Sequence, residues 1–202
     1  MEAQAGGARR IELCSALEVG GLTPSFGLIK AVKEFCNDIE INVLIRPRPG
    51  DFVYGGDELT QMIYDITQCR KFGVHGVVIG ALTPEGDVNL PFTMLMHHSA
   101  TVTDPTLLHK LSVTFHRSFD VCRDPSAASE DIVTIGCHRI LTSGQCENAL
   151  AGAGNIARYV EQAAGRVIIM PGCGVNPGNI AEIERLTGDT AFHSTARGEA
   201  RT

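Results

Sequence analysis

The chain has 202 residues, of which 44% are hydrophobic and 20% are charged, and these proportions are ordinary for a globular protein with one sizeable core. Its net charge of -6 argues against a general affinity for nucleic acid or for anionic membranes. No apolar run approaches the roughly 20 residues that cross a bilayer. The opening residues, MEAQAGGARR, lack the apolar core of a secretory signal, so we expect a cytoplasmic protein without nucleic-acid or membrane partners.

Short apolar runs alternate with helical segments along the chain, a rhythm typical of parallel α/β folds. Seven strands are predicted, at residues 10–14, 41–47, 75–82, 112–119, 138–144, 166–172 and 190–195. The helices between them have clear boundaries, since glycines follow several helical runs and Asp124 precedes a proline at a first helical position. The segment 91–110 is irregular, and we interpret it as a broken helix followed by a surface loop.

Two architectures fit this rhythm, an open doubly wound sheet and a TIM (β/α)8-type barrel. The barrel is favoured because no G-x-G-x-x-G follows the first strand and no P-loop is present. Residues 2–10 read as the end of a helix, and the chain stops where a helix should follow the last strand. We therefore expect a single (β/α) barrel domain over residues 1–202, truncated at both ends and lacking the first strand and the final helix. A chain that folds poorly is the remaining alternative, since an open barrel exposes two unpaired strand edges.

Polar residues near the predicted strand ends form the first candidate site. In a parallel barrel the chemistry lies at the carboxyl ends of the strands, and alternate side chains point inward. This alternation turns four polar side chains inward, and a carboxylate follows one of them in the loop: Glu12, Arg46, His116, His193 and Asp120. Each residue alone is compatible with a structural role, such as a buried ion pair between Glu12 and Arg46, but the five together favour a functional pocket.

The stretch VTFHRSFD (113–120) supplies the candidate proton carrier of that pocket. Val113 and Phe115 face outward by parity, so His116 faces inward, and imidazole titrates near neutral pH. Asp120 is expected either to orient His116 or to carry charge of its own. Arg117 has the opposite parity and is expected to pair at the surface.

A glycine-rich loop forms a second candidate site. The loop 171–179 opens onto a capped helix, and barrels often bind phosphate through the loops after their last strands. The candidate anion-binding residues are Ser143, Gly172, Gly174 and Arg197. The alternative is a tight turn that needs glycine for its backbone angles.

The cysteines suggest a soft-metal site. Seven cysteines without a C-x-x-C spacing do not indicate a disulfide framework. Cu(I) prefers thiolate ligands, and four thiols are predicted at or just beyond strand carboxyl ends: Cys14, Cys122, Cys146 and Cys173. The alternative is that the cysteines are free buried thiols acting as small hydrophobic side chains.

Several long segments carry a resemblance to a known family. The runs RIELCSALEVGGLTPSFGLIKAV, IRPRPGDFVYGGDEL, GVVIGALTPEGDV, VTFHRSFD, ILTSGQ, MPGCGVN and FHSTAR resemble the CutC copper-homeostasis family, in the family's order, from about Glu2 to Arg197. The resemblance implies a TIM barrel, a cytoplasmic and in eukaryotes also nuclear protein, a homo-oligomer, and a link to copper.

The resemblance also implies particular site residues. The family's pocket positions match Glu12, Arg46, His116, Asp120, Ser143, His193 and Arg197. The cysteine proposed to bind copper matches Cys14, and its proposed partner lies on the family's first strand. Cys173 stands where the family usually has glycine, and the loop 97–110 is longer than the family's.

Two functions follow. The first is a cytosolic copper-homeostasis protein that binds or buffers Cu(I) through Cys14 and neighbouring thiols, with Cys173 as a second candidate ligand. The alternative is a lyase or isomerase that acts on a small phosphorylated or carboxylated metabolite, with His116 as the acid/base and Arg46 and Arg197 as an anion clamp. Whether the protein is an enzyme stays open at this point.

Overall fold

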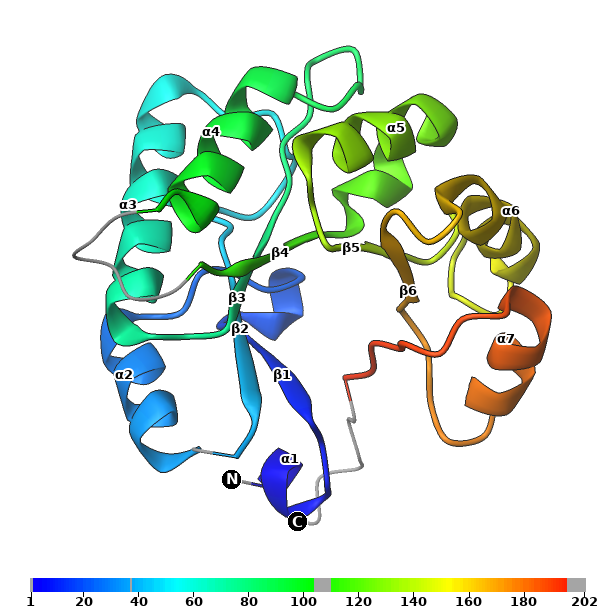
Figure 1. Ribbon diagram of the computed structural model, residues 1–202, viewed down its shortest axis with the longest axis horizontal. Helices are drawn as coiled ribbons and strands as arrows, with labels where there is room; N and C mark the ends of the chain where they lie inside the picture. The colour runs from blue at the N-terminus through cyan, green and yellow to red at the C-terminus, as the bar shows by residue number, and fades with distance from the viewer. Residues whose placement is uncertain (1, 37, 104–109, 196–202) are drawn as a thin grey trace.

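The predicted alternation of strands and helices is present in the computed structural model, which describes residues 2–36, 38–103 and 110–195. Six strands form one parallel sheet in sequential order (Figure 1). They are β1 (Arg10–Leu13), β2 (Glu40–Leu44), β3 (Gly76–Ile79), β4 (Ser112–Phe115), β5 (Arg139–Thr142) and β6 (Ile168–Pro171). The sheet is curled as in a TIM barrel but remains open.

The helices that follow the strands cover the outer side of the curl, whereas the short helix before the first strand lies below that strand, at the bottom of the view (Figure 1). In chain order the helices are α1 (Glu2–Ala5), α2 (Phe26–Phe35), α3 (Gly56–Phe72), α4 (Leu90–Thr101), α5 (Pro125–Ile135), α6 (Ala153–Ala163) and α7 (Ile180–Thr187), with short 3-10 turns η1 (Leu17–Val19) and η2 (Arg117–Val121). The predicted boundary at Asp124 is confirmed, because its carboxylate accepts the backbone N–H groups of Ser126 and Ala127 at the start of α5.

The two faces of the sheet differ in chemistry because side chains alternate along each strand. Val43, Val77 and Val113 lie side by side across three strands. They belong to an apolar layer between sheet and helices, whose strand members are Ile41, Val43, Ile45, Val77, Ile79, Val113, Phe115, Ile140 and Ile169. Burying each such side chain contributes about 1.5–3 kcal/mol. The opposite residues of each strand therefore face the inside of the curl, as the sequence parity predicts.

The seventh predicted strand, at 190–195, is wrong. This segment runs between the β6 and β1 edges without strand pairing (Figure 1). One bond of the strand type forms, from the N–H of His193 to the carbonyl of Pro171 at 2.9 Å. The carboxylate of Asp189 instead accepts the N–H of Thr190 at 3.0 Å, which gives the backbone a local alternative to a ladder.

The broken helix predicted within 91–110 is also wrong in part. α4 is regular from Leu90 to Thr101, and the side chain of Asn89 caps it by accepting the N–H of Phe92 at 3.2 Å. Pro91 lies in the first turn, where a missing N–H removes no helical bond. The expected surface loop falls mostly on residues 104–109, outside the described part of the chain.

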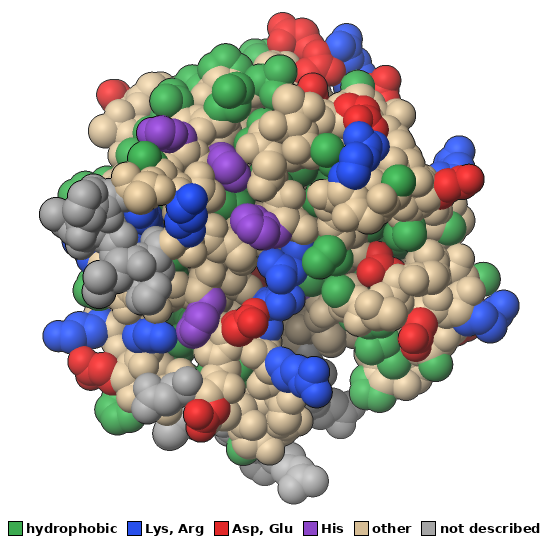
Figure 2. Space-filling model, in the orientation of Figure 1, with side chains coloured by type: hydrophobic (Ala, Val, Ile, Leu, Met, Phe, Trp, Pro, Cys, Tyr) green, Lys and Arg blue, Asp and Glu red, His purple; other side chains and the backbone are tan. Residues whose placement is uncertain are grey.

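Figure 2 shows one face of the molecule, on which acidic, Lys or Arg, and His side chains are intermixed without a broad region of one sign. None of the described helices combines the length and the apolar character that a membrane span requires.

Candidate functional site

The predicted site residues that the structure describes lie at one end of the curl because parallel strands all end on the same side. Glu12 is in β1 and Cys14 follows that strand directly. Five further members lie one to three positions beyond their strands: Arg46, His116, Ser143, Gly172 and Gly174. Asp120 lies in η2, and His193 lies in the segment after α7. The contacts of these residues fall into three groups, around Arg46 and His116, around Asp120, and between Glu12 and His193.

Arg46 holds two loops together. Its side chain is 7% exposed, and its Nη1 donates to the carbonyls of Val19 at 2.9 Å and Gly21 at 3.0 Å. Its Nη2 donates to the carbonyl of Gly50 at 2.9 Å. The close approach depends on the chain geometry at Gly21, whose φ of 90° favours glycine and whose Cβ would lie 2.8 Å from the Leu44 side chain. The predicted ion pair of Arg46 with Glu12 does not form.

His116 is buried against the loop that follows β2. Its Nδ1 accepts the N–H of Ser118 at 3.1 Å and so caps η2. Its ring centroid lies 4.9 Å from that of Phe52. Gly80 makes room for the ring, since a Cβ there would lie 2.5 Å from Cε1 of His116. Glycine within an apolar run can signal such a close approach, whereas nothing in the sequence marked Phe52.

The protonation state of His116 follows from this environment. Burial, with the positive charge of Arg46 added to it, lowers the pKa of His116 to about 3. Because Nδ1 accepts a backbone N–H, the neutral ring carries its proton on Nε2. The acid/base role predicted for His116 at neutral pH therefore has no support in this geometry.

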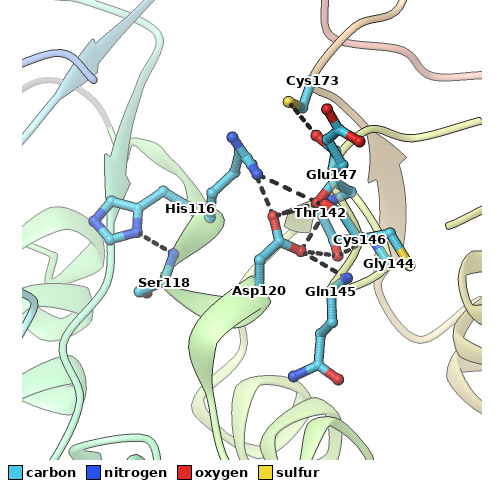
Figure 3. A network of polar contacts seen from close by, with 11 residues as sticks. His116, Ser118, Asp120, Thr142, Gly144, Gln145, Cys146, Glu147 and Cys173 are labelled. Atoms are coloured by element: carbon cyan, nitrogen blue, oxygen red, sulfur yellow. Dashed lines mark hydrogen bonds and ion pairs between the residues drawn. The ribbon is translucent and has the colours of Figure 1, made fainter. Parts of the chain in front are cut away.

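Asp120 organises the loop after β5 (Figure 3). Its carboxylate is 7% exposed and accepts the hydroxyl of Thr142 at 2.5 Å, the N–H of Ser143 at 2.9 Å and the N–H of Gln145 at 3.3 Å. Arg117 is half-exposed and pairs with the same carboxylate at 2.7 Å. Asp120 therefore satisfies backbone and side-chain donors of this loop.

The expected contact between Asp120 and His116 is not formed. Figure 3 shows the His116 ring pointing away from the carboxylate, toward its own partner Ser118. Their sequence spacing places Asp120 on the far side of the η2 turn, where the β5 loop supplies stronger partners.

Glu12 and His193 form the third group, which spans the open side of the sheet. The imidazole Nε2 lies 3.3 Å from a carboxylate oxygen of Glu12. Burial disfavours the imidazolium, but the hydrogen bond and charge of Glu12 outweigh burial and raise the pKa of His193 above 6.5. This contact joins the segment after α7 to β1.

In the predicted anion-binding loop, several polar groups already have hydrogen-bond partners within the protein. Ser143 is fully buried, and its N–H and hydroxyl are engaged by Asp120. The N–H of Gly172 donates to the carbonyl of Thr142 at 2.9 Å. The carbonyl of Gly174 accepts the side-chain amides of Asn176 and Asn179 at 3.0 and 2.8 Å. These contacts match the alternative of a tight turn, and Arg197 lies outside the described residues.

The thiols divide by exposure. Cys14, Cys146 and Cys173 are partly exposed. The other four are buried, including Cys122, which was predicted, like these three, to lie at or just beyond a strand carboxyl end. Burial raises the pKa of Cys69, Cys122 and Cys137 to about 12. Within the described residues, no group of three or more His, Cys, Asp or Glu is placed to hold a metal ion.

Cys173 has a backbone conformation that favours glycine. Its φ is 75°, in the left-handed region, and its thiol makes one contact of 3.3 Å with the carbonyl of Glu147. A side chain in this region costs roughly 1 kcal/mol or more. We expect Cys173→Gly to raise the free energy of unfolding by about 0.5–1 kcal/mol, measured by urea denaturation. A loss of stability would instead indicate that the thiol contact outweighs the strain.

A depression of about 790 Å³ lies at the opposite end of the sheet. It is lined by residues that precede or begin the first strands, Gln4, Gly7, Ala8, Arg9, Asp38, Ile39, Glu40 and His75. Because barrel chemistry is placed at the carboxyl ends of strands, this depression is not the candidate site.

Comparison with known proteins gives a consistent picture. A family model described as the CutC family matches residues 1–198. A CutC family protein of Parabacteroides distasonis is 51% identical over 98% of this chain and 78% of its own length, and one of Xylella fastidiosa is 47% identical over 98% and 70%. A solved CutC structure from Streptococcus agalactiae, described as a candidate copper homeostasis protein, is 33% identical with a TM-score of 0.83 and covers 91% of this chain and 87% of that one. An aldolase, QR15, is similar in fold alone, with a TM-score of 0.62 and 13% identity over 87% and 77% of the two chains.

Proposed function

Because the chain belongs to the CutC family, we propose that it serves copper homeostasis by binding Cu(I) through Cys14 and neighbouring thiols. Copper is the cargo in this proposal, and the protein buffers it in the cytoplasm and, in eukaryotes, in the nucleus as well. The observation that carries the proposal is the placement of the thiols.

The three partly exposed thiols all follow strand carboxyl ends, and so they lie at the same end of the sheet. Cys14 follows β1, Cys146 lies in the loop after β5, and Cys173 follows β6. The buried thiols are separated from this end chemically, because burial holds those of Cys69, Cys122 and Cys137 in the protonated form. Cu(I) binds the thiolate form of soft ligands, so only the exposed set is suited to capture it.

Cys14 is the strongest candidate in this set. The turn beside it contains Gly21, and even a Cβ at that position would lie 3.6 Å from the Cys14 sulfur. Cys14 is itself partly exposed, and it is the position at which the resemblance implies a copper ligand. Cu(I) does not need a cluster of three hard and soft ligands, so the lack of such a cluster among the described residues is compatible with a thiolate site.

We expect Cys14→Ser to weaken Cu(I) binding by at least about tenfold, because hydroxyl is a poor ligand for a soft ion. The measurement is a titration against a chromophoric Cu(I) chelator under anaerobic, reducing conditions. Cys137→Ala, which removes a buried thiol, is the matched control and should bind as the wild type does. Equal affinity of wild type and Cys14→Ser would remove Cys14 as a ligand.

A lyase or isomerase with His116 as the acid/base has less support. The low pKa of His116 and its engaged Nδ1 leave no site that takes up a proton at neutral pH. The part of this alternative that keeps support is the binding of a small anion.

A further inference from the structure

The guanidinium of Arg46 is buried without a carboxylate partner. Its hydrogen bonds of good geometry go to backbone carbonyls, its one neighbouring side-chain hydroxyl is that of the neutral Tyr54, and none of the ion pairs between described residues includes it. Carbonyl oxygens satisfy hydrogen bonds but do not neutralise the charge. A buried charge that is not neutralised is costly, so an anion would be strongly favoured beside it.

Arg48, in the same loop as Arg46, has carboxylate partners that neutralise its charge. Its guanidinium binds Asp51 at 2.9 Å and Glu58 at 2.5 Å, and its side chain is 35% exposed. The loop and the first turn of α3 therefore provide one carboxylate each for the more exposed arginine and none for the buried one.

One edge of the Arg46 guanidinium keeps hydrogen-bond donors that could bind an anion. A guanidinium has five N–H donors, and three are taken, two on Nη1 and one on Nη2. The Nε–H is buried without a partner, and one hydrogen remains on Nη2. Nε and Nη2 form the edge that binds a carboxylate or phosphate through two parallel hydrogen bonds.

His116 has a further hydrogen-bond donor without a partner, and its ring lies next to Phe52, as the guanidinium of Arg46 does. Its Nε2 carries the proton, is buried and has no partner. The Phe52 ring centroid lies 5.1 Å from the Arg46 guanidinium carbon and 4.9 Å from the His116 ring. Phe52 is itself partly exposed, and its ring lies next to both residues that carry these buried donors.

We propose that a small oxyanion, the carboxylate or phosphate group of a small molecule, binds at the Nε–Nη2 edge of Arg46, with the Nε2–H of His116 as a further donor. The anion neutralises the buried guanidinium. His116 contributes as a neutral hydrogen-bond donor, and no proton transfer is involved. The site uses no thiol, although it lies near the proposed copper ligand, because Gly21 accepts a hydrogen bond from Arg46 and also approaches the Cys14 sulfur.

The test is an NMR titration of the ¹⁵N-labelled full chain with inorganic phosphate and, separately, with acetate, against chloride at equal ionic strength. The expected result is a saturable shift of the Arg46 Nε–H and His116 Nε2–H resonances with at least one oxyanion. A response to phosphate alone or to acetate alone identifies the oxyanion class. Responses to both oxyanions that merely equal the response to chloride would overturn the proposal.

Two variants separate this site from general charge effects. His116→Asn keeps an acceptor near the Nδ1 position for Ser118 but removes the Nε2 donor, and it should bind about tenfold more weakly. Arg48→Gln removes a neutralised guanidinium from the same loop and should bind as the wild type does. Unchanged affinity in His116→Asn would remove His116 from the site. Should that variant fail to fold, the wild-type His116 resonance decides the point.

Discussion

Asp120→Ala is expected to lower the free energy of unfolding by about 3–5 kcal/mol. The carboxylate is buried, and it accepts donors from Thr142, Ser143 and Gln145. Its removal leaves these donors without partners inside the protein, and a buried donor that loses its partner carries the full cost of its desolvation. Urea denaturation at neutral pH measures the effect, provided that the slope of the transition is unchanged.

Arg117→Ala is the matched control for this variant. Arg117 pairs with the same carboxylate, but its side chain is 44% exposed. An exposed partner of this kind contributes roughly 0–1 kcal/mol. If the two variants lose equal stability, the ion pair and not the loop network is the main contribution of Asp120.

Acidification from pH 6.5 to pH 5 is expected to lower the free energy of unfolding by about 2 kcal/mol through His116 alone. The pKa of His116 is about 3 in the folded protein and 6.5 when unfolded. Between these values the unfolded chain binds a proton that the folded chain does not, so stability falls as pH falls. Burial also lowers the pKa of His97 and His138, and both act in the same direction.

His193 makes the free energy of unfolding change with pH in the opposite direction to His116, and it does so over a different pH range. Its pKa is raised in the folded protein, so its contribution is complete below pH 6.5 and is lost as pH rises through the raised value. It therefore does not cancel the acid effect of His116. Urea midpoints measured at steps between pH 5 and pH 8 resolve the two windows.

His116→Asn tests the assignment of the acid effect. This variant has no imidazole at position 116, so its stability should change less with pH between 6.5 and 5 than that of the wild type. An identical pH dependence in both proteins would assign the acid effect to other groups.

The alternation of side chains was predictable from VTFHRSFD because it depends only on local backbone geometry. Val113 and Phe115 lie in the apolar layer, and His116 is turned away from it, as parity requires. The same reasoning failed at 190–195, since an apolar run does not reveal whether a strand edge is available to pair with it. There the side chain of Asp189 captures the backbone locally.

The partners of the polar residues were not predictable from the sequence. Asp120 was expected beside His116, four positions away, but it serves the loop after β5. His116 instead meets Phe52 and Gly80, which come from two other segments. Spacing along the chain predicts which strand end a residue occupies, but not which of several donors and acceptors lies nearest.

The sequence by itself determined the order of strands and helices, the apolar face of the sheet and membership of the CutC family, because each of these depends on local pattern or on overall similarity. The tertiary structure decided which polar groups are satisfied. It turned His116 from an expected proton carrier into a buried neutral donor, and it left Arg46 charged without a carboxylate. The reason is physical: burial and hydrogen-bond partners depend on segments distant in sequence, and these set both the protonation of a side chain and what it can bind.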